Sequence, residues 1–134
     1  MKLTKEDKEL IEEAKKIIVK SNAIKLIDTA DFGAALITSK GSIYSGVSLG
    51  FTCGIGSCAE YQAVGSMISN GEKEIKIIVA ISCNGNIYPP CGKCREMLHQ
   101  LSKNSDNIAV IISKDEKIKL KDLLPYAYKG TIEK

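Results

Sequence analysis

The chain has 134 residues, of which 44% are hydrophobic and 26% charged, a composition typical of one globular domain with a real core. Its formal net charge of +3 comes from scattered lysines, which argues against nucleic-acid binding. No stretch is apolar for long enough to span a membrane, and the first residues lack the apolar centre of a signal peptide. We therefore expect a single cytoplasmic domain over residues 1–134, with no membrane and no nucleic acid among its partners.

The apolar periodicity alternates between helix and strand along the chain. Thr4 and Asp7 have the spacing of a capping box, which indicates where the first helix begins. The sequence predicts, in chain order, a helix over 4–20, strands over 33–38 and 43–47 with a turn at 39–42 between them, a loop over 50–57, a helix over 58–70, a strand over 75–82, a turn at 84–86, a helix over 91–101, a strand over 108–113, a turn at 115–117 and a short helix over 120–124. This order favours an α/β fold: a three-layer α-β-α sandwich, with a mixed sheet of about five strands and helices on both faces.

Three of the five cysteines have the spacing of metal ligands. Cys91 and Cys94 lie one turn apart at the start of a predicted helix, and Cys58 begins an earlier helix, so all three sulfurs can hold one zinc ion. Helix N-termini also favour the thiolates that a metal needs. Three protein ligands leave the fourth position of a tetrahedral zinc open to water. Glu60, two residues after Cys58, is a carboxylate close enough to move that water's protons.

Two other interpretations of these cysteines stay open at this point. The pair Cys91 and Cys94 also suits a thioredoxin-like redox site, and Cys53 as a fourth ligand would close a purely structural zinc site. Otherwise Cys53 and Cys83 are expected to be small buried apolar residues. His99 lies eight residues into its helix and is expected to be an ordinary surface or boundary histidine.

The motif Cys58-Ala59-Glu60, followed by Pro90-Cys91-Gly92-Lys93-Cys94, resembles the zinc signature of the cytidine deaminase family in its short three-cysteine form. The first predicted hairpin and the segment Leu123-Leu124-Pro125 are also similar to that family. The resemblance implies one Zn²⁺ per chain and hydrolytic deamination of the cytosine base of a free nucleoside, in which Glu60 shuttles protons from water to the ring and to the departing amino group.

The resemblance also implies roles for residues around the metal. It assigns the base edge to Ala59, Pro89 and Pro90, and it expects an aromatic residue from the C-terminal segment, Tyr128, to cover the pocket. Arg95 is expected to offset part of the negative charge of three thiolates on zinc. Short family members of this kind are homotetramers, which implies the same assembly here.

Departures from the family pattern concern the sugar. Family members usually carry Asn-x-Glu on the second strand to bind ribose hydroxyls, whereas Ser48-Leu49-Gly50 stands here. Phe32 is expected to replace a missing aromatic that stacks on the base, and Tyr61 stands where an arginine is common. Residues 65–71 and 90–98 are similar to blasticidin-S deaminases, which act on a nucleoside antibiotic, and the loop ending at Ser57 offers room for a modified sugar. A deaminase of that type is therefore the alternative function.

Overall fold

The computed structural model describes residues 1–26 and 29–130, so residues 27–28 and 131–134 of the expected domain lie outside the described ranges. The helices are α1 (Lys5–Asn22), α2 (Ala59–Ser69), α3 (Gly92–His99) and α4 (Leu120–Leu123), with short 3-10 turns η1 (Thr52–Gly54) and η2 (Ser105–Asn107). The strands are β1 (Phe32–Thr38), β2 (Ile43–Val47), β3 (Leu49–Gly50), β4 (Gly56–Ser57), β5 (Ile75–Ser82), β6 (Ala109–Ile111) and β7 (Lys117–Lys119).

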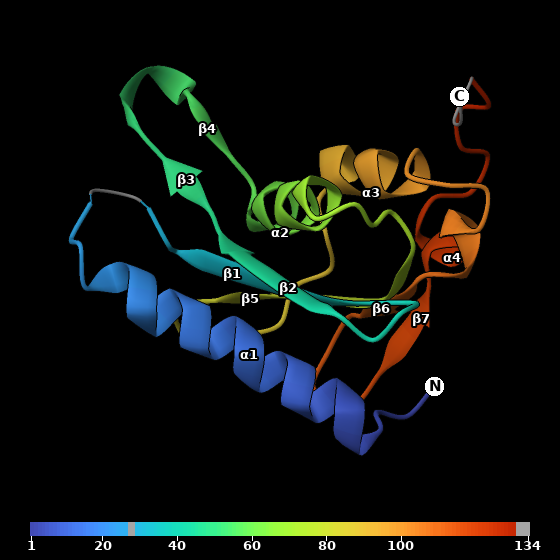
Figure 1. Ribbon diagram of the computed structural model, residues 1–134, viewed down its shortest axis with the longest axis horizontal. Helices are drawn as coiled ribbons and strands as arrows, with labels where there is room; N and C mark the ends of the chain where they lie inside the picture. Colours follow the sequence, from blue (N-terminus) through green and yellow to red (C-terminus); the bar gives the residue numbers. More distant parts are fainter. Residues whose placement is uncertain (27–28, 131–134) are drawn as a thin grey trace.

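Five strands form one mixed sheet in the order β2-β1-β5-β6-β7. The β5–β6 pair is parallel, and the other three pairs are antiparallel. Helix α1 covers one face of this sheet, and α2, α3 and α4 lie on the other (Figure 1). The predicted three-layer sandwich with a mixed five-stranded sheet is confirmed. Among the described residues no helix combines the length and apolarity needed to cross a bilayer.

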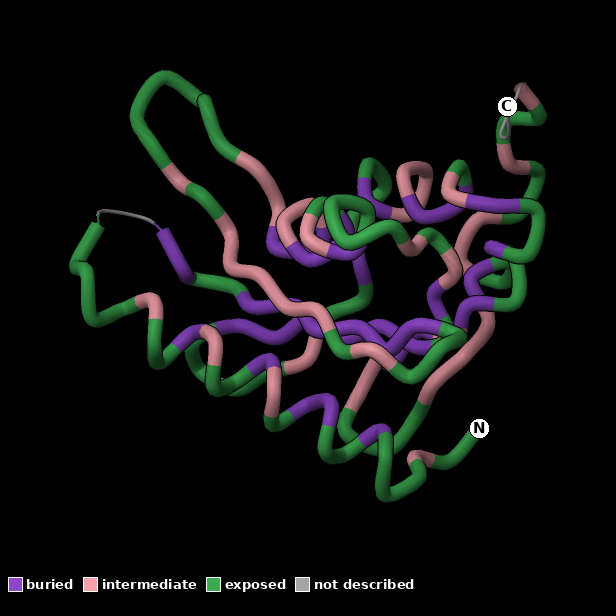
Figure 2. Tube along the Cα trace, viewed as in Figure 1, coloured by how far each residue is buried: buried purple, intermediate pink, exposed green. Residues whose placement is uncertain are grey.

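The sheet is buried on both faces, and its side chains alternate between two cores. On β1, Ala34 and Leu36 face α2 and α3, whereas Ala35 and Ile37 face α1. Strand β5 is apolar along nearly its whole length because both faces of the sheet are covered there (Figure 2).

Two short elements differ from the sequence predictions. The expected loop over 50–57 contains the β3–β4 hairpin, in which a Cβ atom on Gly56 would collide with the Leu49 carbonyl oxygen. The expected turn at 115–117 ends earlier, because Lys117 already belongs to β7, which pairs with β6. Strands of two or three residues carry too few positions for an alternating pattern, so their existence depends on the neighbouring strand.

The N-terminus of α1 is joined to β7, the strand at one edge of the sheet. Thr4 and Asp7 form the predicted capping box, with the Thr4 N–H donating to the Asp7 carboxylate at 2.8 Å. The same carboxylate oxygen accepts a 2.6 Å bond from the Lys117 ammonium. Asp7 is fully buried and the Lys117 side chain is only 14% exposed, so this ion pair has little access to water.

Replacing Asp7 with Ala should lower the free energy of unfolding by about 3 kcal/mol, because the Lys117 ammonium would stay largely buried without its partner. The matched control is Glu13→Ala, which breaks an exposed pair with Lys16 and should cost less than about 1 kcal/mol. Urea denaturation of both variants measures the difference. Equal costs would show that the Asp7–Lys117 pair contributes no more than a surface pair.

The pH dependence of this effect follows from the pKa of Asp7. Burial raises that pKa, but the bonds from Lys117 and Thr4 outweigh burial and hold it below the ordinary value of 3.8. A lowered folded-state pKa means that the ionised carboxylate stabilises the fold above pH 3.8, and that this stabilisation is lost as the pH falls through the lower pKa. The difference between wild type and Asp7→Ala should therefore shrink only in strongly acidic solution.

Candidate metal centre and active site

The three cysteines predicted as metal ligands meet where two helices begin. Cys58 is the N-cap of α2 and Cys91 the N-cap of α3, positions at which polar side chains usually face the free backbone N–H groups of a first turn. Cys94 follows within the first turn of α3 and is fully buried. Their Sγ atoms all lie within 4.8 Å of one another.

The sulfur spacing fits a tetrahedral zinc ion. Zn–S bonds of about 2.3 Å place two sulfurs of a tetrahedron about 3.8 Å apart. Here the Cys58 and Cys91 Sγ atoms are 3.8 Å apart, and the Cys91 and Cys94 Sγ atoms are 3.5 Å apart. Within residues 1–26 and 29–130, no further cysteine, histidine or carboxylate joins this group, so Cys53 is not a fourth ligand.

The thiols differ in how readily they ionise without a metal. Burial raises the pKa of Cys58 and that of Cys94. Burial also raises the pKa of Cys91, but hydrogen bonds from the Cys94 backbone amide and the neighbouring thiols outweigh it and lower the pKa below its usual value. A bound cation removes the cost of burying thiolates, because it supplies the opposite charge.

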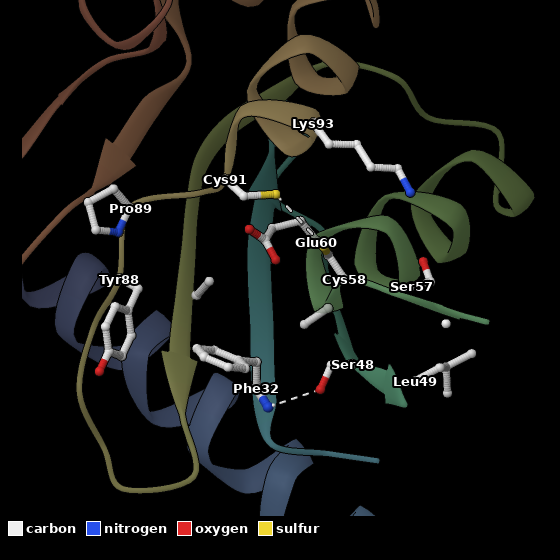
Figure 3. A pocket seen from close by; sticks show the side chains of 13 residues that line it. Phe32, Ser48, Leu49, Ser57, Cys58, Glu60, Tyr88, Pro89, Cys91 and Lys93 are labelled. Carbon is white, nitrogen blue, oxygen red and sulfur yellow. Dashed lines mark hydrogen bonds between the residues drawn. The ribbon is translucent and has the colours of Figure 1, made fainter. Parts of the chain in front are cut away.

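Glu60 lies beside the sulfur group on the first turn of α2. Its side chain is only 6% exposed, and burial raises the pKa of its carboxyl above the usual value. Figure 3 shows the carboxylate directed into the pocket next to Cys91 and Cys58. Close packing fixes this position: a Cβ atom on Gly46 of β2 would stand 2.5 Å from Gln62 Cβ, so α2 lies directly against the sheet.

A cavity of about 490 Å³ opens in front of the cysteines and Glu60. Its predicted lining residues are Phe32, Ser48, Ser57, Ala59 and Pro89, together with Cys58, Cys91 and Glu60. Five other lining residues were not predicted from the sequence: Leu49, Gly56, Ala80, Tyr88 and Lys93. Apart from the metal end, the walls are mostly apolar, so the cavity suits a small flat molecule with one polar reacting edge.

Two aromatic side chains form one wall of the cavity. The Phe32 and Tyr88 rings meet edge to face, with centroids 5.6 Å apart. Ser48 faces them from the neighbouring strand end, and its hydroxyl accepts a 3.0 Å bond from the Phe32 N–H (Figure 3). The Ser48 hydroxyl is thus partly engaged by the protein itself.

The family model for the cytidine and deoxycytidylate deaminase zinc-binding region matches residues 4–116. The chain belongs to this family. It is therefore a zinc-dependent deaminase, and the group formed by Cys58, Cys91 and Cys94 is suited to the zinc ion of that family.

Individual relatives agree with this assignment. The chain is 31% identical over 105 residues to blasticidin-S deaminase of Bacillus cereus, an alignment that covers 72% of this chain and 75% of that protein. It is 27% identical over 99 residues to cytidine deaminase of Halalkalibacterium halodurans, with the same two coverages. The fold is similar to the crystal structure of cytidine deaminase from Mycobacterium tuberculosis, with a TM-score of 0.78 and 22% identity over 92% of this chain and 97% of that one.

Three residues expected at the deaminase site are not among the described lining residues of the cavity. Tyr128 does not line the cavity of its own chain; its ring is 70% exposed and its carbonyl oxygen lies 3.1 Å from His99 Nε2. Pro90 is buried, and its carbonyl oxygen accepts a 2.7 Å bond from Arg95 Nε. Arg95 also donates to the Leu123 carbonyl at 3.0 Å, so its guanidinium joins α3 to α4.

The remaining cysteines and the histidine also differ in burial from the expectation. Cys53 and Cys83 are exposed, because both lie in turns at the edge of the molecule. His99 is buried and bridges Asp106 and the Tyr128 carbonyl. It lies outside the cavity lining, as expected for a residue without a part in the deaminase reaction.

Proposed function

We propose that this deaminase hydrolyses the cytosine base of a free nucleoside, turning cytidine or deoxycytidine into uridine or deoxyuridine and ammonia. The observation that carries the proposal is a buried carboxylate, Glu60, beside three metal-binding sulfurs at the end of a small cavity. A cavity of about 490 Å³ is in the range for a nucleoside-sized ligand. The reaction belongs to pyrimidine salvage, since it returns a uracil nucleoside.

Cys58, Cys91 and Cys94 would hold one Zn²⁺ per chain. When bound, zinc acts as a Lewis acid that makes water a stronger nucleophile at neutral pH. The two helix N-termini at Cys58 and Cys91 contribute partial positive charge next to the thiolates. Both helix starts therefore favour the deprotonated ligands that zinc requires.

Glu60 carries the proton transfers in this proposal. It accepts a proton from the attacking water and delivers it to ring N3 as the C4–O bond forms. It then takes the remaining proton from the new C4 hydroxyl and passes it to the amino group, so that C4=O forms as the C4–N bond breaks and ammonia leaves. Burial supports this role, because a raised pKa brings the carboxyl closer to the pH at which it must both accept and donate.

The base is proposed to lie between the metal end and the aromatic wall. Ala59 and Pro89 line the cavity, and their backbone groups would bind the polar edge of the base, while Phe32 offers a ring face or edge to it. Ser57 and Ser48 lie toward the sugar side and offer hydroxyl groups. Among the described lining residues, Glu60 is the sole carboxylate, so the sugar hydroxyls find no second acidic partner.

Comparing cytidine, deoxycytidine and blasticidin S as substrates, by the loss of cytosine absorbance, tests this proposal. We expect turnover of both nucleosides, with kcat/KM values within about tenfold of each other, because a site without a carboxylate for the ribose hydroxyls gains little from the 2′-hydroxyl. A preference for cytidine of a thousandfold or more, on the order of what a hydroxyl-binding site achieves, would contradict the described sugar side. The zinc-free protein serves as the control for background hydrolysis.

A blasticidin-S-type deaminase is the second candidate. The 31% identity to blasticidin-S deaminase of Bacillus cereus favours it, as does the absence of a second lining carboxylate among the described residues. Turnover of blasticidin S without turnover of either nucleoside would select this alternative.

We also propose a single deaminase domain that assembles as a homotetramer in the cytoplasm. One sheet with its two cores includes every described helix, which supports one domain. The β3–β4 hairpin projects from the body of the molecule and carries exposed Phe51 and Ile55 (Figure 1). A neighbouring subunit would cover this apolar surface. Sedimentation velocity measures the number of subunits and so checks the proposed tetramer. Five free cysteines suit a reducing compartment.

A further inference from the structure

The metal centre of this chain carries excess negative charge. Three thiolates on one Zn²⁺ sum to a net charge of −1, and an ionised Glu60 adds a second negative charge beside them. Such charge is costly to bury unless a cation compensates it. The centre therefore needs a positive group in addition to the two helix N-termini.

Arg95 does not supply that charge, although it follows Cys94 directly. Its guanidinium donates to the carbonyl oxygens of Pro90 and Leu123, on the side of α3 that faces α4. It is also absent from the described lining of the cavity.

Lys93 is the single basic residue among the described lining residues, where it stands with Cys58, Cys91 and Glu60. Its ammonium lies 4.8 Å from the centre of the Tyr61 ring, a cation–π contact. Figure 3 shows the side chain extending from the start of α3 across to α2, above Glu60 and Ser57. The described ion pairs do not include Lys93, so its charge is not neutralised by another carboxylate.

We propose that Lys93, held in place by the Tyr61 ring, is a positioning residue that offsets the negative charge of the metal centre. Tyr61 follows Glu60 on α2, and Lys93 lies between two of the metal ligands on α3, so the contact joins the two helices that provide the site. The ring attracts the ammonium without neutralising it, which leaves its positive charge available to the thiolates. This inference rests on the proposed zinc centre and is independent of which nucleoside is the substrate.

Three variants of the full-length zinc protein test the role of charge. Lys93→Met removes the charge and keeps a similar stem, Lys93→Arg keeps the charge and the cation–π contact, and Lys114→Met removes one lysine from a distant exposed turn. Zinc affinity is measured by competition with a chromophoric chelator. We expect Lys93→Met to bind zinc about tenfold more weakly or worse, whereas Lys93→Arg and Lys114→Met stay within about threefold of wild type.

A fourth variant tests the part played by the ring. Tyr61→Leu keeps the lysine and removes its cation–π partner, so zinc affinity should fall by less than in Lys93→Met and should not fall further when the two changes are combined. Additive losses would show that Tyr61 does not act through Lys93.

Two outcomes would overturn the proposal. Equal losses of zinc affinity in Lys93→Met and Lys93→Arg would assign the effect to packing of the stem. Unchanged zinc affinity in Lys93→Met, together with a raised KM, would make Lys93 a substrate-binding residue. A zinc protein that follows the expected pattern but deaminates no cytosine nucleoside would instead contradict the proposed function and leave this inference standing.

Discussion

Glu60→Gln is expected to lower the rate of ammonia release from a cytosine nucleoside by a factor of about 10² to 10⁴, the usual contribution of a positioned general acid–base. Glutamine has nearly the same shape but cannot accept or deliver the protons. Because Glu60 is only 6% exposed, bulk water has little access with which to replace it. The measurement is the rate of ammonia release at saturating nucleoside, with zinc content determined on the same sample.

Zinc should stay bound in this variant, because Glu60 is not a member of the three-sulfur group. The matched control is Glu12→Gln, an exposed residue of α1 on the opposite face of the sheet, which should leave the rate unchanged. Full turnover by Glu60→Gln would remove the proton-transfer role assigned to this carboxylate. Loss of zinc along with activity would instead make Glu60 part of the metal site.

The main elements of the fold were predictable because burial on two faces leaves a strong pattern in the sequence. The run over Ile75–Ser82 predicted a central strand, and the structure has β5 with the same bounds. The β7 strand was missed because it has three residues, two of them lysines, and forms only through pairing with β6 and the contact of Lys117 with Asp7. Local sequence carries no information about either partner.

The chemical centre was predictable because its geometry is local. One helical turn joins Cys91 to Cys94, so spacing alone brings their sulfurs to one side of α3. Cys58 is the extended N-cap of α2 and Glu60 lies in the first turn of that helix, so two residues of chain keep the sulfur and the carboxylate at the same helix end. Arg95, expected to offset the thiolate charge, donates to the Pro90 and Leu123 carbonyls for a related reason. Adjacent residues on a helix point about 100° apart, so the neighbour of a buried ligand faces another direction.

The cavity walls were less predictable because they come from several distant segments. Leu49, Tyr88 and Lys93 line the cavity through the arrangement of the β3–β4 hairpin, the segment after β5 and the start of α3. Two signals were present: Lys93 lies between two predicted ligands, and Tyr88 precedes Pro89, to which a role in the pocket was already assigned. Their orientation, however, depends on how α2 packs against the sheet at Gly46.

Replacing a zinc ligand should remove metal and activity together, whereas replacing a cysteine outside the group should remove neither. Cys91→Ser is the most informative ligand variant, because Cys91 is exposed and its loss does not disturb the core. Serine offers a hydroxyl that ionises far less readily than a thiol, so the zinc site falls to two thiolates. We expect zinc content well below the wild-type value of about one per chain, and turnover at the level of the zinc-free protein.

Cys53→Ser and Cys83→Ser are the matched controls, since both side chains are exposed and neither sulfur belongs to the group. Both variants should keep the zinc content and turnover of wild type, measured by metal analysis and by loss of cytosine absorbance. This comparison separates a catalytic centre with one open position from a closed structural one. If Cys53→Ser lost zinc as Cys91→Ser does, a fourth sulfur would fill the position that water must occupy, and the deaminase mechanism built on Glu60 would have no place to act.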